Sequence, residues 1–477
     1  MIKIYQISSQ GYQVLSALGD HNLLNTIETA LRSIEIMDNP WPTPDACRVG
    51  KHNAEIPVSV LATASVCAAV SALQSLCEAE FGNCPEAGVD GISVDQWCKS
   101  SVTPLGWFLP SKWDAFSKDY RTNDGWVRLH TNAPHHRNAA LDVLGGPVTP
   151  QDAANEIKRW SGDTLEQAIV DAGGCAAKLR TAEDWRNHPQ GLAVRSEPIV
   201  GWDEALQKAS RWMPVSPNRP LTGLRVLDLT RVLAGPVATR FLASVGADVL
   251  RIDPPDWTED GNAIEMTVGK TCAGLDLTDT KDRETFSQLV STANVMVHGY
   301  RADALDGLGF GIKACRTINP SLITVGLNAY GWQGPWCGRR GFDSLVQRSS
   351  GLAKEHDGLV KELQYQVLDH ATGYMMAAAV LHAVRVQRTS NRVLSANLSL
   401  ARQAKLLVDH TGLSESEPPS TQAYLISGGR GERTDWGPIW RLALPYRIKG
   451  VETGWDVAAH KLRTDKPEWR SMKEKTQ

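Results

Sequence analysis

Short apolar runs alternate with amphipathic stretches through the second half of the chain. The apolar runs are rich in β-branched residues, as buried strands are; they are LRVLDLT (224–230), DVLRIDPP (248–255), NVMVHGY (294–300) and LITVGLNAYG (322–331). Amphipathic stretches such as KDRETFSQLVSTA lie between them. Alternation of strands and helices with short connections is typical of parallel βαβ units. The pattern therefore predicts an α/β protein with an open, mainly parallel sheet that carries helices on both faces.

An open sheet of this Rossmann-like kind binds its ligands at the carboxyl ends of the strands. The loops that follow Thr230, Ile252, Val297 and Gly326 are therefore the ones expected to form a site. The first of them, RVLAGP (231–236), also opens a helix, so its backbone N–H groups are able to approach a phosphate or another polar ligand group.

The first half of the chain has a different pattern. Its predicted elements are one long helix, one strand and two short helices, at 58–82, 124–131, 152–162 and 164–174. These elements predict a smaller α+β domain. Three prolines in RWMPVSPNRPLTG (211–223) indicate an extended linker. We therefore divide the chain into residues 1–215 and residues 216–477.

A faint internal repeat links the two parts. The helical stretch Val60–Leu76 overlays VLDHATGYMMAAAVLHAV (367–384), and each is followed by a short alternating run, GISVDQ in the first part and VLSANLSL in the second. On this overlay Asp369 lies opposite Ala62, so only the second copy keeps the acid. Two similar amphipathic helices with no common origin are the alternative interpretation.

The charge balance argues against a nucleic-acid-binding surface. Lys and Arg number 50 against 53 Asp and Glu, a formal net charge of -3, and no dense basic run is present. The first residues lack the unbroken apolar core of a signal peptide, and no stretch reaches the roughly 18 apolar residues that a membrane helix needs. Nine cysteines without a CxxC pair suggest reduced thiols. We expect a cytoplasmic protein that binds neither nucleic acid nor membrane.

One carboxylate stands directly before a long apolar helical run. Asp369, in VLDHATG, precedes the run ATGYMMAAAV. Aspartate is a favoured helix N-cap, and a carboxylate in apolar surroundings can also serve as a nucleophile. The spacing alone favours the cap. The neighbouring His370 points in a different direction at a helix start, so we expect it to support the site rather than to act as its base.

Six segments of the second half occur in an order and spacing that match a known family. They are LRVLDLTRVLAGPVATRFLASVGADVLRID, GKTCAGLDL, ANVMVHGYRADALDGLGFG, INPSLITVGLNAYGWQGPW, RRGFDSLVQRSSGL and LDHATG. From about residue 221 to residue 410 the chain resembles the family III CoA-transferases, which include formyl-CoA transferase, carnitine CoA-transferases and α-methylacyl-CoA racemase. The first half is similar, more loosely, to the later part of the same module, in DGWVRLHTNAPHHRNAALDVLGG and GGCAAKLRTAEDWRNHPQG. Relative to one family module, the halves are therefore rearranged and partly duplicated.

The resemblance implies that Asp369 is a nucleophile. In the family this aspartate attacks an acyl-CoA thioester to give a mixed anhydride. CoA thiolate then returns to form an aspartyl-CoA thioester, which passes CoA to an acceptor acid. Covalent catalysis divides one difficult transfer into easier steps. The implied enzyme takes an acyl-CoA and a small organic acid as substrates, with CoA as substrate rather than as a tightly bound cofactor, and it uses no metal.

The same resemblance implies a set of CoA contacts and an arrangement of subunits. The expected CoA-binding residues are Arg231, Val232, Leu233, Ala234, Gly235, Arg251, Tyr300, Arg301 and Arg340. The arginine fork suits phosphates; an exposed surface charge is the alternative for Arg251, Arg301 and Arg340. Ala302 and Asp303 depart from the Pro-Gly that many relatives have after the arginine. Family members form interlocked dimers, so this chain is expected to be a homodimer subunit or a self-contained monomer.

Phe342 separates two enzyme mechanisms. The racemase branch pairs the aspartate with a histidine directly after a glycine, and here Phe342 follows Gly341. Transfer between acids needs only the carboxylate, so the sequence favours a transferase. With His298 or His370 as a substitute base, an α-methylacyl-CoA racemase or epimerase is the alternative. A degenerate, non-catalytic CoA-binding protein is a third reading.

Two polar clusters have simpler interpretations. SGGRGER (427–433) is predicted to be a flexible surface loop, although some relatives use a mobile glycine loop to shield the anhydride and to donate N–H groups to the oxyanion. HTNAPHHR contains His130, His135 and His136, but no neighbouring cysteine or carboxylate pattern completes a ligand set. We therefore predict no metal site there.

Overall fold

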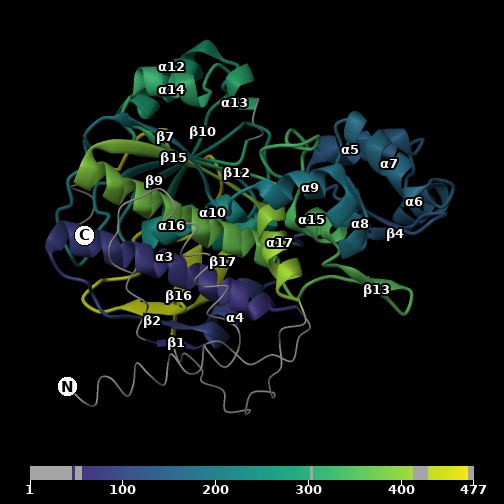
Figure 1. The fold of residues 1–477 in the computed structure, drawn as a ribbon, viewed down its shortest axis with the longest axis horizontal. Coiled ribbons are helices and arrows are strands. Elements are labelled where there is room, and N and C mark those ends of the chain that lie inside the picture. Colours follow the sequence, from purple (N-terminus) through teal and green to yellow (C-terminus); the bar gives the residue numbers. More distant parts are fainter. Residues whose placement is uncertain (1–45, 49–55, 301–303, 412–427, 471–477) are drawn as a thin grey trace.

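A seven-stranded sheet forms the centre of the molecule. The structure is a computed structural model that describes residues 46–48, 56–300, 304–411 and 428–470. The strand order is β10-β9-β8-β11-β12-β15-β7, and all neighbours are parallel except β15 and β7 (Figure 1). The α/β class and the mainly parallel sheet are thus confirmed. The strands are β7 (Gly201–Gln207), β8 (Arg225–Leu229), β9 (Asp248–Asp253), β10 (Lys270–Gly274), β11 (Val295–His298), β12 (Ile323–Asn328) and β15 (Arg392–Ser399).

Alternate side chains of the strands enter two separate hydrophobic cores. In β11, Val295 and Val297 belong to the larger core and Met296 belongs to the smaller one. This alternation follows from the two-residue period of a strand, and burial on both faces explains why the parallel strands read as continuous apolar runs. Helices α10 (Ala234–Ser244) and α16 (Val367–Ser390) contribute to the larger core, whereas α12 (Thr280–Thr292) and α14 (Ile312–Ile318) contribute to the smaller one.

Two helices of equal length lie side by side in the larger core. α3 (Val58–Phe81) and α16 each have 24 residues, and they pack along one another (Figure 1). Among the described helices, α3 alone is long and apolar enough to cross a membrane, which the sequence reading did not anticipate; 94% of its most apolar window is buried inside the molecule. A helix that is apolar on all sides is typical of a buried core. Its contact with α16 accounts for its hydropathy.

The two halves of the chain exchange strands. β7 comes from the first half, yet it forms an edge of the central sheet beside β15. Conversely, β18 (Tyr446–Ile448) comes from the second half and pairs with β2 (Ala87–Asp90), whose other neighbour is β1 (Ala46–Arg48). β2 and β15 each have one parallel and one antiparallel neighbour, so β1-β2-β18 repeats the arrangement β12-β15-β7 at the edge of the central sheet. Both halves supply strands to each of these two sheets, so the division of the chain into two domains near residue 215 stays a prediction.

One run of the predicted repeat differs from expectation. GISVDQ begins helix α4 (Gly91–Lys99) instead of forming a strand, because the Asp90 side chain accepts a hydrogen bond from the Ile92 N–H and caps the helix. The strand of this copy is β2, directly before it. In the second copy, β15 is likewise followed by a capped helix, α17 (Leu400–Asp409), with Ser399 as the cap.

The glycine cluster near the C-terminus is a strand. Gly429–Thr434 form β16, which pairs with β17 (Gly437–Leu442), and β17 pairs in turn with β3 (Val102–Pro104). Within β16, the buried Glu432 accepts a hydrogen bond of 2.7 Å from Arg441 Nε. The prediction of a flexible loop is therefore wrong over these residues, because the strand ladder and a buried ion pair hold them. Ser427 lies outside the described residues.

A small sheet with three helices forms a separate lobe beside the carboxyl ends of the central strands (Figure 1). Leu129, Ile157 and Ile169 are fully buried in its core. The elements of this lobe, hereafter the small lobe, are β4 (Asp119–Arg121), β5 (Trp126–Leu129), α5 (Pro134–Val143), α6 (Pro150–Ile157), α7 (Gly162–Asp171) and β6 (Ala176–Lys178).

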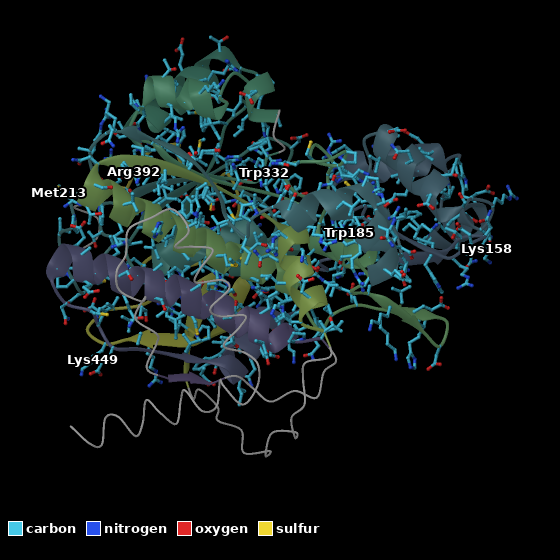
Figure 2. The ribbon with its side chains drawn as sticks, in the orientation of Figure 1. Lys158, Trp185, Met213, Trp332, Arg392 and Lys449 are labelled. Atoms are coloured by element: carbon cyan, nitrogen blue, oxygen red, sulfur yellow. The ribbon has the colours of Figure 1, made fainter. Side chains whose placement is uncertain are left out.

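Ion pairs and aromatic rings attach the small lobe to the sheet. Arg348 Nη2 lies 2.7 Å from Asp119 Oδ2, and Arg339 Nη2 lies 2.9 Å from Glu166 Oε1. Trp185, in the segment that follows the small lobe, packs against Tyr330 and Trp336, and Figure 2 shows it between the small lobe and the centre of the molecule. Buried pairs of this kind define one orientation of the lobe. The remaining elements here are α8 (Ala182–Asn187), α9 (Pro189–Ser196), α15 (Asp343–Ser350), β13 (Lys354–His356) and β14 (Leu359–Lys361).

The predicted linker is irregular, as expected. Residues 211–223 contain neither helix nor strand. The two other short helices, α11 (Asp260–Met266) and α13 (Ala304–Gly307), lie in the connections that follow β9 and β11.

Candidate active site

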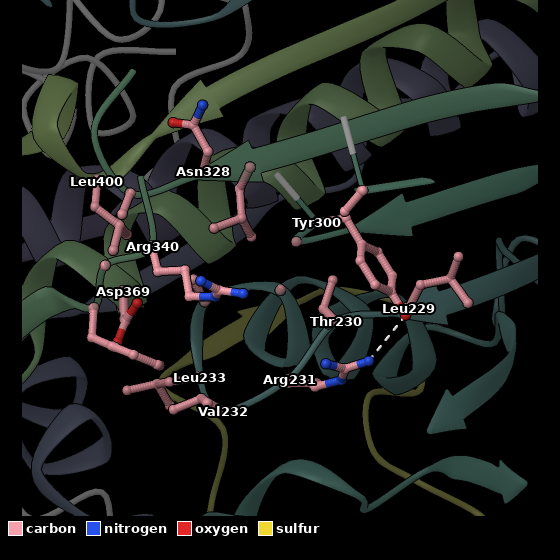
Figure 3. A pocket seen from close by; sticks show the side chains of 18 of the residues that line it. Leu229, Thr230, Arg231, Val232, Leu233, Tyr300, Asn328, Arg340, Asp369 and Leu400 are labelled. Atoms are coloured by element: carbon pink, nitrogen blue, oxygen red, sulfur yellow. Dashed lines mark hydrogen bonds between the residues drawn. The ribbon is translucent and has the colours of Figure 1, made fainter. Parts of the chain in front are cut away.

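A pocket of about 360 Å³ opens at the carboxyl ends of the central strands (Figure 3). Its walls come from the loops after β8, β11 and β12, from the start of α16 and from the small lobe. This is where a parallel open sheet is expected to bind its ligand. The lining residues are His135, His136, Leu229, Thr230, Arg231, Val232, Leu233, Ala234, Gly235, Trp257, Gly299, Tyr300, Ala304, Leu327, Asn328, Ala329, Arg339, Arg340, Gly341, Phe342, Asp369 and Leu400.

Asp369 lines this pocket and is not the cap of its helix. It is the third residue of α16, whose N-cap position is Gln366. Four residues later, Gly373 packs so closely on α10 that an added Cβ would lie 2.3 Å from the Ala234 carbonyl oxygen. Residues four apart share one helix face, so this contact directs Asp369 toward the loop that precedes α10. Within the described residues, the Asp369 carboxylate accepts no hydrogen bond.

A second carboxylate, from Asp343, caps α16 in its place. Asp343 Oδ2 accepts a hydrogen bond of 3.0 Å from the Asp369 N–H, and Oδ1 accepts one of 2.6 Å from Gln347. The Asp343 carboxyl thus lies against the backbone N–H of Asp369, near enough for its charge to act on the Asp369 carboxyl. Burial, and then the charge of Asp343, raise the pKa of Asp369 well above its usual value. Burial raises the pKa of Asp343 to about 7, although the hydrogen bonds from Gln347 and Asp369 oppose that rise.

The loop from Arg231 to Gly235 forms the opposite wall and has an unusual backbone. Val232 adopts a φ of 66°, in the left-handed region that a β-branched residue rarely occupies. Its N–H donates a 2.7 Å hydrogen bond to Glu259 Oε2. Gly235 is required by packing, since an added Cβ would lie 2.2 Å from the Thr230 side chain. Strain held by specific contacts is often found at functional sites.

Arg251 does not reach the pocket. It is fully buried in β9, where its guanidinium lies 2.6 Å from Glu259 Oε1 and 2.8 Å from Asp253 Oδ2. The sequence suggested a direct contact with the nucleotide. In the structure Arg251 instead supports the loop from Arg231 to Gly235 from behind, because it fixes the carboxylate that holds Val232. The attractive charges of Glu259 and Asp253 raise the pKa of Arg251 against the opposing effect of burial.

Arg231 and Tyr300 lie together on the side of the pocket away from Asp369 (Figure 3). Arg231 Nη2 donates a 3.0 Å hydrogen bond to the Tyr300 hydroxyl, and the guanidinium also packs over the ring of Trp257 at 4.9 Å. Its Nε is buried and has no partner among the described residues. Of the two neighbouring residues predicted to contact CoA, Tyr300 and Arg301, only Tyr300 is seen at the pocket, because Arg301 lies outside the described residues.

Arg340 and two histidines of the small lobe complete the pocket. Arg340 was expected from the sequence, whereas His135 and His136 were weighed only as metal ligands and were missed as pocket residues. Burial lowers the pKa of His136 to about 3, and the neighbouring His135 and Arg340 add to this effect. The missed signal was the loose likeness of HTNAPHHR to the part of the family module that faces the site.

The other histidines considered in the sequence analysis do not line the pocket. His130 stacks on Phe342 with ring centroids 3.6 Å apart, which joins the small lobe to the pocket wall. His298 and His370 are buried elsewhere, and burial lowers the pKa of His298 to about 4 and that of His370 to about 3. No group of three or more potential metal ligands occurs in the described ranges.

Residues 221–424 match the family model described as CoA-transferase family III. This match confirms the resemblance that the six sequence segments indicated. It covers the strands β8 to β15, the loop from Arg231 to Gly235, Asp343 and Asp369.

Characterised relatives carry related names. The chain is 37% identical over 304 residues to the acetyl-coenzyme A transferase nodX of Hypoxylon pulicicidum, which covers 56% of this chain and 50% of that protein. It is 32% identical over 197 residues to the succinate–glutarate CoA-transferase of Agrobacterium fabrum, covering 35% and 49%. The chain spans about half the length of the curated relatives that it matches.

A solved structure aligns with part of the chain. The crystal structure of the protein Rv3272 from Mycobacterium tuberculosis aligns with 40% of this chain and 58% of its own, at 28% sequence identity and a TM-score of 0.38. The matching sequence of that organism is described as a probable fatty acyl-CoA transferase and is 30% identical over 235 residues.

Proposed function

Because residues 221–424 belong to CoA-transferase family III, we propose that the chain is an acyl-CoA:carboxylate CoA-transferase with Asp369 as its nucleophile. The observation that carries the proposal is the position of the Asp369 carboxylate. It lines the pocket while Asp343 performs the helix-capping role that would otherwise occupy it. The names of the relatives, which include CoA-transferases for several acids, support the class of reaction.

The proposed reaction has four steps. A carboxylate oxygen of Asp369 attacks the thioester carbon of the donor. The C–S bond breaks, CoA leaves as the thiolate, and a mixed anhydride of Asp369 and the donor acid remains. The thiolate then attacks the aspartyl carbonyl and releases the donor acid, which leaves an aspartyl-CoA thioester. The acceptor carboxylate attacks that thioester and again expels the thiolate. Finally the thiolate attacks the acceptor carbonyl, which gives the new acyl-CoA and frees Asp369.

The loop from Arg231 to Gly235 would receive CoA in this scheme. Glu259 holds the strained Val232 peptide and Gly235 packs against Thr230, so the loop has a fixed shape where it lines the pocket. Arg231, Tyr300 and Arg340 supply hydrogen-bond donors along the walls. CoA is then a substrate that enters and leaves, and the acyl group lies toward Asp369.

A single chain would suffice for this site. Asp369 comes from the second half, and His135 and His136 come from the first half of the same chain. We therefore propose that the first half completes the site in cis.

Racemisation is the second candidate activity, and the pocket supports it less. It needs a second acid–base group opposite the aspartate. Phe342 occupies the position where the racemase branch has histidine, and His298 and His370 are not among the lining residues. His135 and His136 are the remaining imidazoles at the pocket.

Assays for the two reactions decide between them. The protein is incubated with an acyl-CoA and a panel of acids in deuterated water, and both the CoA esters and the α-deuterium content are measured by mass spectrometry. The proposal expects new CoA esters without α-exchange, and both signals absent in Asp369→Asn. Exchange that depends on Asp369 without any new ester would replace it with a racemase.

A further inference from the structure

The small-lobe wall of the pocket has the composition of an anion site. Helix α5 begins with Pro134, which has no N–H, and its N-cap residue Ala133 offers no side-chain acceptor. The N–H groups of His135 and His136 have no acceptor within the described residues, as is usual for the first turn of a helix. A helix start with free N–H groups attracts negative charge.

Two side chains at this helix start point independently to a ligand. His136 lines the pocket, is only 5% exposed, and its Nδ1 has no partner among the described residues. Arg340 lines the same region and forms no ion pair in the described ranges; its one hydrogen bond is a 3.4 Å contact with the Gly173 carbonyl oxygen. A buried polar atom without a partner is uncommon in a native fold. The wall therefore has hydrogen-bond donors, on Arg340, His136 and the first turn of α5, that a ligand with an acceptor group could use.

The position of this wall separates it from the CoA-binding loop. Arg340 extends from the Asp369 side toward the middle of the pocket, whereas Arg231 and Tyr300 stand on the opposite side (Figure 3). His130 stacked on Phe342 and the Arg339–Glu166 pair hold the small lobe in place next to Arg340. The reacting acyl carbon, attached to Asp369, would thus lie close to this wall.

The charges favour a carboxylate that does not react. Among the described lining residues Asp369 is the one acid, whereas three arginines, Arg231, Arg339 and Arg340, line the same pocket. An acid that reacts through its single carboxylate loses its charge when it becomes an anhydride and then a thioester. A second carboxylate keeps its charge through every step and stays paired with the arginine. Guanidinium–carboxylate pairs are strong and directional.

We propose that Arg340, His136 and the first turn of α5 form a carboxylate subsite, so that the acid handled by this pocket is a dicarboxylate whose second carboxylate binds there. This inference rests on the proposed function for the identity of the reacting group. The subsite itself is a binding site of the small lobe and can be tested without turnover.

The kinetic test compares two acids of equal chain length. Glutarate and valerate are offered as acceptors to the full-length protein with acetyl-CoA as donor, and kcat/KM is measured for each. We expect a preference for glutarate of about tenfold or more, which Arg340→Met reduces by a similar factor and Arg340→Lys reduces less. His136→Phe should lower the preference as well. The matched control, Arg231→Met, should slow both acids to the same extent.

A binding test keeps this inference separate from the activity. Saturation-transfer NMR measures contact of glutarate and of valerate with the protein in the absence of CoA. We expect a stronger signal for glutarate, and its loss in Arg340→Met. If no acyl-CoA is turned over but this binding pattern is found, the proposed function fails and the subsite stands. Equal use and equal binding of the two acids, or an equal loss for both acids in Arg340→Met, would overturn the subsite.

Discussion

The two long helices of the molecule, α3 and α16, have similar structural surroundings but different relations to the pocket. α3 and α16 have equal lengths, each leads into a strand and a capped helix, and each strand has one parallel and one antiparallel neighbour. The strand that follows α16 belongs to the seven-stranded sheet, whereas the strand that follows α3 belongs to a sheet of three strands. Of the two helices, only α16 has an acid in its first turn. On the sequence overlay, α3 has the buried Ala62 there.

This difference assigns separate roles to two similar substructures. The copy around α16 forms the pocket, whereas the copy around α3 buries an apolar surface against it and leads the chain toward the small lobe. Each copy also supplies the antiparallel strand of the other, β7 in one direction and β18 in the other. The first half thus supports the pocket through α3 and supplies part of its wall through the small lobe.

The largest expected effect comes from removing the acid of the active copy. Asp369→Asn keeps the shape of the side chain and removes the nucleophile, so CoA transfer should fall by about 1,000-fold or more. The measurement is the initial rate of acyl-CoA formation at saturating donor. The control is Asp95→Asn, a change to a carboxylate of the α3 copy that does not line the pocket. A transfer rate in Asp369→Asn near that of the wild type would assign the chemistry to another group.

The next effect comes from adding an acid to the other copy. Ala62 is 1% exposed and belongs to the larger core, so Ala62→Asp would bury a charge among apolar side chains. We expect the free energy of unfolding to fall by on the order of 3 kcal/mol, and no second centre to appear. Denaturant titration gives the stability, with Ala62→Ser as a milder control. Restored transfer in the Ala62→Asp, Asp369→Asn double variant would show that the two copies are functionally equivalent.

A smaller effect is expected from the cap of α16. Asp343→Ala leaves the Asp369 N–H without its acceptor, so the helix should lose about 1–2 kcal/mol and the rate of transfer should drop by about tenfold or more because Asp369 is no longer held. Asp343→Asn keeps one oxygen acceptor and should recover much of the stability. Stability and kcat are measured on the same preparations. Equal losses in both variants would favour a role for the charge over the role of the cap.

The smallest effect is a change of stability with pH. The folded-state pKa of Asp343 is about 7 and that of Asp369 is raised, so the native protein binds more protons than the unfolded chain above about pH 4. Stability should therefore fall as the pH rises through this window. Asp369→Asn removes one of the two carboxyl groups, and its gain over the wild type should be larger at pH 8 than at pH 5, by on the order of 1–2 kcal/mol. A gain that does not change with pH would contradict the close pairing of the two groups.

Local sequence signals predicted the elements of the sheet and much of the site. The strands β8, β9, β11 and β12 were recognised because strands buried on both faces read as short continuous apolar runs rich in β-branched residues. The loop from Arg231 to Gly235, Tyr300, Arg340 and Asp369 line the pocket as the family resemblance implied. These positions follow from motifs whose members lie close together along the chain.

Contacts between segments that lie far apart in the chain could not be predicted from the sequence. The cap of α16 comes from Asp343, 26 positions before Asp369, and nothing local marks it as a cap. Arg251 was expected at the ligand because of the family resemblance, and its sequence position does not reveal the ion pair that the fold forms with Glu259. His135 and His136 reach the pocket through the docking of the small lobe, and β7 and β18 cross between halves.

Chemical trapping tests the central claim most directly. The protein is mixed with an acyl-CoA donor, quenched with hydroxylamine, and mapped by peptide mass spectrometry, with Asp369→Asn in parallel. The account predicts a hydroxamate on Asp369, absent in the variant, and no modification of the peptide that contains Ala62. A donor that is turned over while Asp369 stays unmodified, or a label on another residue, would contradict the assignment of the nucleophile to the α16 copy.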